Sequence, residues 1–206
     1  MPKKSIFHIT HLDNLPSMIA EARLWSDSQR IARNLNTTGI GHEHIKQRRL
    51  RRKVAVAARG FLGEYVPFNF CPRSVMLFAI YKGGVAQYRG GQNPIVHLVS
   101  SIEAAVDTGR PCAFTDRHAE LGYAQYFDDM DELDKIDWKV MPLEYWAGSE
   151  ETKEKRQAEF LVHDWFPWDA VLQIGVKTQQ TKEKVEEILA SCDDVPRVVL
   201  KPAWYY

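Results

Sequence analysis

The sequence QAEFLV, residues 157–162, is the stretch on which the interpretation of this chain depends. Ala158–Val162 is typical of a short buried strand, and Glu159 lies inside it. An ionised carboxylate is almost never fully buried without a partner. Glu159 therefore either points to the solvated face of a sheet or lines a cleft in which it takes part in chemistry. Taken alone, the stretch favours the solvated face.

On both sides of this strand, short strands alternate with short helices. Strands are predicted at Ser5–Thr10, Tyr65–Phe70, Ile95–Ser100, Cys112–Thr115, Ala158–Val162, Val171–Val176 and Arg197–Lys201. Helices are predicted at Asn14–Leu24, Ser74–Tyr81, Ile102–Thr108, Ala119–Asp137 and Thr181–Ser191. Residues 138–155 are predicted as a loop, and 26–59 as loop with short helices, an insertion long enough to suggest a functional role. The order of elements indicates an α+β or mixed α/β fold.

Composition narrows the class of protein. The chain has 206 residues and 45% hydrophobic composition, which fits one domain spanning residues 1–206. Acidic and basic residues balance at 27 each, but residues 46–53 (KQRRLRRK) form a basic run and residues 128–137 (DDMDELDKID) an acidic one. The three cysteines have no metal-binding spacing, and their odd number argues against a disulfide framework. With no signal peptide or membrane span in the sequence, we expect a soluble cytoplasmic protein.

Several polar residues could carry chemistry, each with a plainer alternative. His8 and Thr10 share one face of the first strand and could hydrogen-bond a ribose, although an isolated histidine is often a core residue. The basic run could contact phosphates or form a solvated face. The aromatic stretch YVPFNFCPRS, residues 65–74, could sandwich a planar ring or simply pack. His118, in FTDRH, could move a proton near neutral pH or lie in a helix N-terminus.

Other sequence signals argue against several classes of enzyme. The chain contains neither G-x-G-x-x-G nor G-x-x-x-x-G-K-[ST], so a Rossmann or P-loop nucleotide site is not expected. There is no G-x-S-x-G elbow for a hydrolase. No second carboxylate lies near Glu159 in the sequence, so a paired-carboxylate glycosidase is not indicated.

Taken together, the motifs resemble one family. FHITHLDNL (7–15), IKQRRL (45–50), YVPFNFCPRSVML (65–77), GGQNPIVHLV (90–99), FTDRH (114–118), KRQAEFLV (155–162) and the terminal WYY are similar to DarT, the DNA ADP-ribosyltransferase toxins of DarT–DarG toxin–antitoxin systems. The resemblance implies an α+β ADP-ribosyltransferase fold, a split mixed β-sheet with flanking helices and NAD in its cleft. It also implies transfer of ADP-ribose to a base of single-stranded DNA, with thymine favoured over guanine. No metal is implied, and the expected partner is the macrodomain-containing antitoxin DarG.

The same resemblance assigns roles to individual residues. It places the catalytic glutamate at Glu159, a catalytic and NAD-contacting arginine at Arg49, and a histidine near the acceptor at His118. Further NAD neighbours are expected at His8, Thr10, His11, Asn14, Tyr65 and Ser74. Candidate DNA contacts are Arg48, Arg51 and Arg52 for phosphates, with Tyr145, Trp146 and Trp138 as a stacking platform; core packing is the alternative for the aromatics.

Three points stay open at the level of sequence. Asn69 stands where the family more usually has an aromatic residue. Either Glu159 or His118 could take the proton from the acceptor base. An ADP-ribosyltransferase acting on RNA or protein, or a nucleic-acid binder without activity, would use the same fold.

Overall fold

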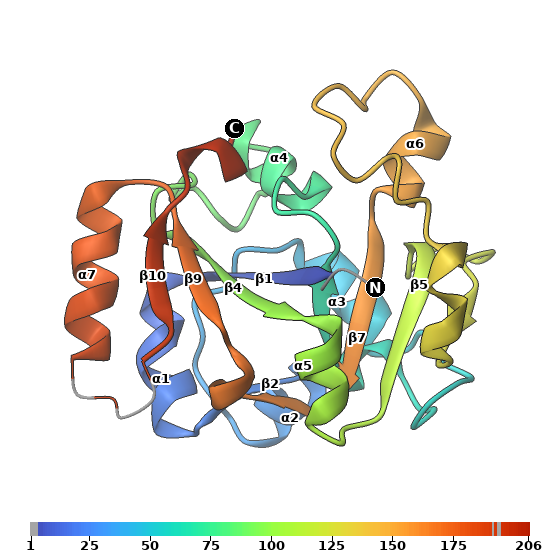
Figure 1. Cartoon of the computed structure of the whole chain (residues 1–206), viewed down its shortest axis with the longest axis horizontal. Helices are drawn as coiled ribbons and strands as arrows, with labels where there is room; N and C mark the ends of the chain where they lie inside the picture. The colour runs from blue at the N-terminus through green and yellow to red at the C-terminus, as the bar shows by residue number, and fades with distance from the viewer. Residues whose placement is uncertain (1–3, 191, 193–194) are drawn as a thin grey trace.

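The computed structural model describes residues 4–190, 192 and 195–206 (Figure 1). Among these residues, eight strands form one mixed sheet in the order β10-β9-β4-β1-β3-β7-β5-β6. Their bounds are β1 Ser5–His11, β3 Tyr65–Asn69, β4 Ile95–Ser101, β5 Cys112–His118, β6 Tyr126–Phe127, β7 Ala158–His163, β9 Gln173–Val176 and β10 Arg197–Leu200. All pairs are antiparallel except β9 with β10, which is parallel.

The sheet opens between β1 and β3. In the described chain, β1 pairs with β4 along its whole length, but it pairs with β3 only where Phe7 faces Asn69. Pro67 in β3 has no backbone N–H to offer β1, so the ladder cannot continue past it. The Pro67 carbonyl instead accepts a hydrogen bond from Nδ1 of His8 at 2.8 Å. A proline and a histidine therefore mark the point at which the sheet splits.

Short helices cover the sheet and its edges. They are α1 Leu15–Ala20, α2 Asp27–Ala32, α3 Glu43–Arg49, α4 Val75–Tyr81, α5 Ile102–Asp107, α6 Glu150–Lys155 and α7 Gln179–Leu189. A small second sheet pairs β2 (Arg23–Trp25) with β8 (Trp165–Pro167). In Figure 1, α7 lies beside β10 at one end of the sheet, α4 lies near the top centre and α6 at the upper right. The largest fully buried side chains include Phe68, Phe114 and Phe160, which lie on β3, β5 and β7, the strands that carry part of the site.

The expected fold class, α+β with a split mixed sheet and flanking helices, is confirmed. The strands predicted around Ser5–Thr10, Tyr65–Phe70, Ile95–Ser100 and Ala158–Val162 are present within one or two residues of their predicted ends. So are the helices predicted at Ser74–Tyr81 and Ile102–Thr108. The helix predicted at Thr181–Ser191 is α7, which begins earlier, and its last predicted residue lies outside the described ranges.

Three predicted elements were wrong. The stretch Ala119–Asp137 is not a helix but a turn, the short strand β6 and a 3-10 helix over Met130–Lys135. Carboxylates compete with helix formation here, since Asp116 and Asp129 accept hydrogen bonds from nearby backbone N–H groups. The helix predicted to reach Leu24 ends at Ala20, because Ala22 has a φ of 53° and the chain turns into β2. The predicted loop 138–155 contains α6.

Three other observations bear on the class of protein. Cys71, Cys112 and Cys192 are free thiols. Within the described ranges, histidine, cysteine and acidic side chains nowhere gather in a group of three that could hold a metal ion. None of the described helices has the length and apolar character needed to cross a bilayer.

Candidate active site

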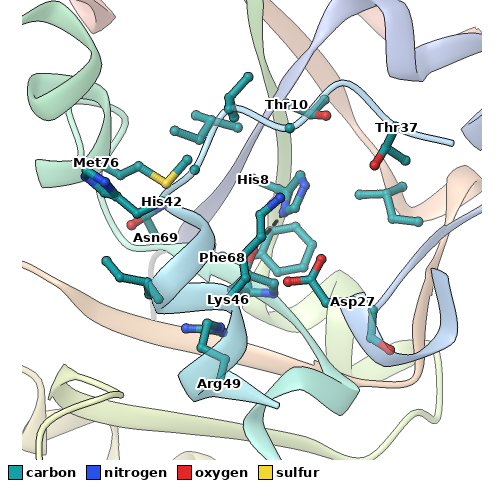
Figure 2. Close-up of a pocket in the computed structure, with 18 of the residues that line it drawn as sticks. His8, Thr10, Asp27, Thr37, His42, Lys46, Arg49, Phe68, Asn69 and Met76 are labelled. Atoms are coloured by element: carbon teal, nitrogen blue, oxygen red, sulfur yellow. Dashed lines mark hydrogen bonds between the residues drawn. The ribbon is translucent and has the colours of Figure 1, made fainter. Parts of the chain in front are cut away.

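A cavity of about 320 Å³ opens where β1 and β3 separate (Figure 2). Strands β1, β3 and β7 form its floor through residues such as His8, Phe68 and Glu159. Residues 24–30, residues 37–42 and α3 form a second wall, and α4 contributes Met76 and Ala79. The predicted functional insertion 26–59 thus supplies much of the lining, which the local sequence did not specify residue by residue.

Glu159 lies in this cavity and is paired with Arg49. Nη1 of Arg49 donates to both carboxylate oxygens, at 2.8 and 3.0 Å. Glu159 is 7% exposed and Arg49 is 9% exposed. Burial by itself lowers the pKa of Arg49, but the adjoining carboxylate outweighs this effect, and the net shift is upward. The solvated-face interpretation of Glu159 is therefore wrong, because a partner 110 residues away compensates its charge.

The pair leaves one strong donor without a partner. Nη2 of Arg49 is buried, and no hydrogen bond to it exists in the part of the chain that the structure describes. A buried donor that lacks an acceptor costs about 1–3 kcal/mol. Arg49 lines the cavity, so a ligand oxygen there would satisfy Nη2.

His8, Thr10 and Asn14 also reach the cavity, as the sequence suggested. The Asn14 amide donates to Oγ1 of Thr10 at 2.9 Å and to the Thr38 carbonyl at 3.0 Å, and its oxygen accepts from the Thr38 N–H at 2.7 Å. One asparagine thereby fixes residues 37–39 against β1. Burial lowers the pKa of His8, and the hydrogen bond to Pro67 opposes this shift only in part. With the proton on Nδ1, the neutral ring keeps an acceptor lone pair on Nε2.

His118 ends β5 and lies on the other side of Glu159. Its Nδ1 accepts the backbone N–H of Glu120 at 3.0 Å. Burial lowers the pKa of His118 below 6.5; Glu159 opposes the shift and Arg49 adds to it. The β5–β7 register shifts between Phe114 and His118, and this irregularity carries the histidine to the cavity lining.

Three expected NAD neighbours lie elsewhere. Tyr65 lies at the start of β3, at the opposite end of the strand from Asn69, and is buried beside Leu62 and Leu161; its hydroxyl donates to the Arg59 carbonyl. Ser74 is the N-cap of α4 and accepts the Leu77 N–H. His11 caps the turn after β1 through the Asp13 N–H. None of the three is among the residues that line the cavity, and each already has a structural role that explains its chemistry.

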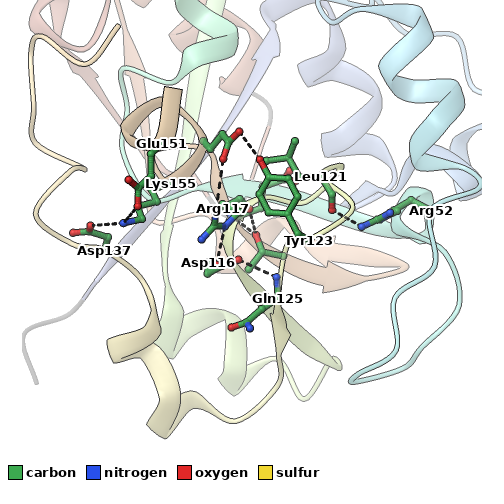
Figure 3. A network of polar contacts seen from close by, with 12 residues as sticks. Arg52, Asp116, Arg117, Leu121, Tyr123, Gln125, Asp137, Glu151 and Lys155 are labelled. Carbon is green, nitrogen blue, oxygen red and sulfur yellow. Dashed lines mark hydrogen bonds and ion pairs between the residues drawn. The ribbon is translucent and has the colours of Figure 1, made fainter. Parts of the chain in front are cut away.

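The basic run is used within the fold more than the sequence suggested, and Figure 3 shows one of its contacts, from Arg52 to Leu121. Arg48 pairs with Glu120 at 2.5 Å, and Arg52 donates to the Leu121 carbonyl. Both contacts tether the turn that follows His118 to the end of α3. Arg51 is exposed, so of the three arginines predicted to bind DNA it is the least engaged.

The predicted stacking platform is only partly available. Tyr145 is 93% exposed, but Trp146 is 5% exposed and packs edge-on against Phe78, with Arg156 near its ring. Trp138 packs against Phe70 and donates to the Leu133 carbonyl. For Trp146 core packing is the correct interpretation, because its large apolar ring is buried. Trp138 is only partly buried and packs against the core cluster that contains Phe70.

The sequence gave no specific signal for another group of charged residues in the cavity. Asp27 and Arg30 form an ion pair at 2.7 Å at the start of α2, and Arg30 donates to the hydroxyl of Thr37. Lys46 lies in α3, one turn before Arg49, and extends across the cavity toward His8 (Figure 2). Their spacing in the insertion follows no motif, so only the folded chain brings them together.

This lining suits a dinucleotide such as NAD. It combines a buried carboxylate and a neutral histidine acceptor, which can hydrogen-bond ribose hydroxyls, with cations for phosphates and apolar side chains for the rings. Nη2 of Arg49, which has no acceptor among the described residues, can donate a hydrogen bond to an oxygen of the dinucleotide.

Comparisons with known proteins agree with this geometry. Residues 7–206 match a family model described as DarT, ssDNA thymidine ADP-ribosyltransferase. A DNA ADP-ribosyl transferase from Thermus sp. (strain 2.9) is 44% identical over 98% of this chain and 95% of its own length.

Solved structures extend the likeness. Thermus sp. 2.9 DarT in complex with ADP-ribosylated ssDNA superposes with a TM-score of 0.94 at 43% identity, covering 98% of this chain and 96% of that one. The same Thermus protein in complex with NAD+ gives a TM-score of 0.91 at 41% identity, over 100% and 99% of the two chains. Thermosipho africanus DarTG in complex with ADP-ribose shares the fold, with a TM-score of 0.83 at 20% identity over 98% of this chain and 51% of that one.

The fold and the cleft are those of an ADP-ribosyltransferase that uses NAD as a substrate. Within that class, the chain belongs to the DarT family of DNA ADP-ribosyltransferases.

Proposed function

We propose that this protein transfers ADP-ribose from NAD+ to a thymine base of single-stranded DNA, with Glu159, Arg49 and His118 at the reacting centre. The observation that carries the assignment is the buried Glu159–Arg49 pair, which lies in the cavity beside His118. Membership of a family described by thymidine modification favours thymine over guanine as the acceptor. Residues 1–206 would act as one catalytic domain.

The proposed reaction exchanges one C–N bond for another. The bond from the ribose C1′ to the nicotinamide nitrogen breaks, and its electron pair leaves with neutral nicotinamide. The thymine ring nitrogen bonds to C1′ and loses its proton. Positive charge builds on the ribose in between, and a carboxylate that binds the ribose hydroxyls stabilises that charge. Glu159 takes this role, while Arg49 fixes its orientation and offers Nη2 to the substrate.

The hydrogen bond at Nδ1 of His118 favours Glu159 over His118 as the base. The Glu120 N–H can only donate, so Nδ1 holds the lone pair and neutral His118 carries its proton on Nε2. Such a ring can donate a hydrogen bond to a thymine carbonyl but has no free lone pair to take a proton. Glu159 remains as the proton acceptor, because each of its oxygens has lone-pair capacity beyond the bonds from Arg49.

Glu159→Gln tests the assignment of function directly. The variant keeps the size and one acceptor oxygen of the side chain but loses its charge. We expect it to fold and to lose at least about 100-fold in transfer, the scale of removing a transition-state charge contact. The assay incubates protein, NAD+ and short single-stranded oligonucleotides, and locates the added mass by fragmentation. Glu186→Gln, on the distant helix α7, is the matched control and should behave as wild type.

The acceptor arms of this assay separate the alternatives. DNA, RNA and protein acceptors are offered in parallel, with oligonucleotides that contain thymine or guanine as the sole reactive base. Mass added only to thymine supports the proposal, and mass added to guanine, RNA or protein replaces it. A protein that binds oligonucleotides but releases no nicotinamide is a binding protein without this activity.

The cellular setting follows from the same proposal. The structural likeness to Thermosipho africanus DarTG supports a role for this protein as a toxin, with the macrodomain-containing antitoxin DarG as its partner. The toxin would act in the cytoplasm, where the DNA is. Expression of the wild-type chain alone should stop growth, and co-expression of the antitoxin should restore it. Growth arrest by Glu159→Gln equal to that by the wild type would contradict the link between activity and toxicity.

A further inference from the structure

The cavity contains one cation whose charge no carboxylate balances. Its described lining includes two acids, Asp27 and Glu159, and each is held by an arginine, at 2.7 and 2.8 Å. Lys46 is the third cation of the lining. Among the described residues, its ammonium group has no ion pair, hydrogen bond or aromatic ring as partner.

Two glycines lie close to the side chain of Lys46. A Cβ built on Gly39 would lie 3.1 Å from Nζ of Lys46, and one on Gly41 would lie 3.6 Å from its Cε. The lysine therefore runs alongside a stretch of chain that has no side chains at these two positions. Lys46 and Arg49 are three residues apart and share a face of α3, so one helix presents both cations to the cavity. In Figure 2, Arg49 and Lys46 diverge, with Lys46 directed toward His8 on β1.

A dinucleotide needs such a cation. The diphosphate of NAD+ carries two negative charges and must shed water on entering the cavity. Arg30 and Arg49 each already neutralise an acid of the lining, Asp27 and Glu159, so neither adds net positive charge to the cavity. Lys46 is paired with no acid among the described residues and supplies the positive charge that remains. Lysine is also well suited to a diphosphate, because its ammonium is a compact charge on a flexible stem.

From the charge balance and this geometry, we infer that Nζ of Lys46 binds the diphosphate of NAD+. The inference rests on the proposed use of NAD+ in this cavity and adds the residue that recognises its phosphates. Arg49 then serves the reacting ribose, and Lys46, one turn earlier in α3, serves the centre of the dinucleotide.

The test compares ligands with and without the diphosphate in the absence of DNA. Lys46→Met keeps the length of the side chain and removes its charge. By calorimetry, we expect it to weaken ADP-ribose binding by about 10-fold, which corresponds to about 1.4 kcal/mol. Binding of adenosine, which lacks phosphate, should not change. Lys46→Arg should restore most of the affinity for ADP-ribose. Lys184→Met, an exposed lysine of α7, is the matched control for the loss of one positive charge and should bind both ligands as wild type does.

Two outcomes of the binding experiment would overturn the inference. Wild-type affinity of Lys46→Met for ADP-ribose overturns the inference. Equal weakening of ADP-ribose and adenosine also overturns it, because the lysine then supports the shape of the cavity. If Lys46→Met is unfolded by circular dichroism, Lys46→Gln takes its place.

Kinetics give an independent readout. In NAD+ turnover, Lys46→Met should raise KM about 10-fold with kcat unchanged, since a contact to the diphosphate is the same before and during bond cleavage. A lowered kcat with unchanged KM would instead place Lys46 at the reacting centre. The binding experiment involves no DNA, so it can succeed even if the acceptor proposed above is wrong.

Discussion

Replacing Arg49 with methionine should destabilise the folded protein by about 3–5 kcal/mol. Both side chains of the Glu159–Arg49 pair are only 10% exposed, and one nitrogen of Arg49 serves both oxygens of Glu159. Arg49→Met therefore leaves a buried carboxylate without its compensating charge. The double variant Arg49→Met/Glu159→Leu removes both charges, and replacement of a buried pair by apolar residues is often neutral. It should be more stable than either single variant.

Urea unfolding, followed by circular dichroism and tryptophan fluorescence, measures these differences when the m-values agree. The double-mutant cycle should give a coupling free energy of at least about 2 kcal/mol. Arg51→Met is the control, because this neighbouring arginine is exposed and should cost less than about 0.5 kcal/mol. A free energy of unfolding for Arg49→Met within about 1 kcal/mol of the wild-type value would contradict this reasoning. So would two single-variant effects that add up to the effect of the double variant, because Arg49 and Glu159 would then not be coupled.

Three further predictions concern other residues. His118→Gln, whose amide can donate a hydrogen bond where Nε2 does, should keep the rate of ADP-ribose transfer within about 10-fold of the wild-type rate, whereas His118→Phe should lower it at least about 100-fold. An equal loss of rate in both variants would indicate that His118 acts as the base. Burial lowers the pKa of His97 to about 4, below its unfolded 6.5, so the folded state binds fewer protons and stability is lost as pH falls from 6.5 toward 4. That loss is about 3 kcal/mol, and His97→Gln should flatten the dependence of the urea midpoint on pH; an unchanged slope would refute it. Tyr145→Ala should weaken binding of single-stranded DNA by about 1–3 kcal/mol without affecting stability, as measured by oligonucleotide binding. Trp146→Ala should destabilise the fold by about 3–5 kcal/mol, as measured by urea unfolding. Weaker DNA binding without loss of stability for Trp146→Ala would show that Trp146, and not Tyr145, contacts the DNA.

The fold could be predicted where one apolar run makes one element. Strands β1, β4 and β7 are short and mostly apolar, and their burial follows from their composition. The prediction for Ala119–Asp137 was wrong because the spacing of its leucine and phenylalanine residues resembles a helix, whereas Asp129, and Asp116 just before the stretch, accept hydrogen bonds from its backbone N–H groups.

The site was predictable only in part, because its geometry is not local. The sequence motifs single out Glu159, Arg49, His8 and His118, but nothing near Glu159 in the chain identifies the partner that allows it to be buried. Lys46 was missed as an individual residue because a cation in a basic run looks like all its neighbours. What distinguishes it is the absence of an acid across the cavity, and this becomes visible only once α2, α3 and β7 are placed.

The ion pair at the centre of the cavity also bears on when activity can arise. Glu159 and Arg49 lie 110 residues apart, and β7, which carries the glutamate, pairs with both β3 and β5. During synthesis the arginine leaves the ribosome long before the glutamate, and at about 5–20 residues per second the interval lasts at least several seconds. We expect a nascent chain to have no transferase activity until β7 has emerged and joined the sheet. A cell that makes this enzyme therefore has an interval, on every round of translation, before the new chain can act on its DNA.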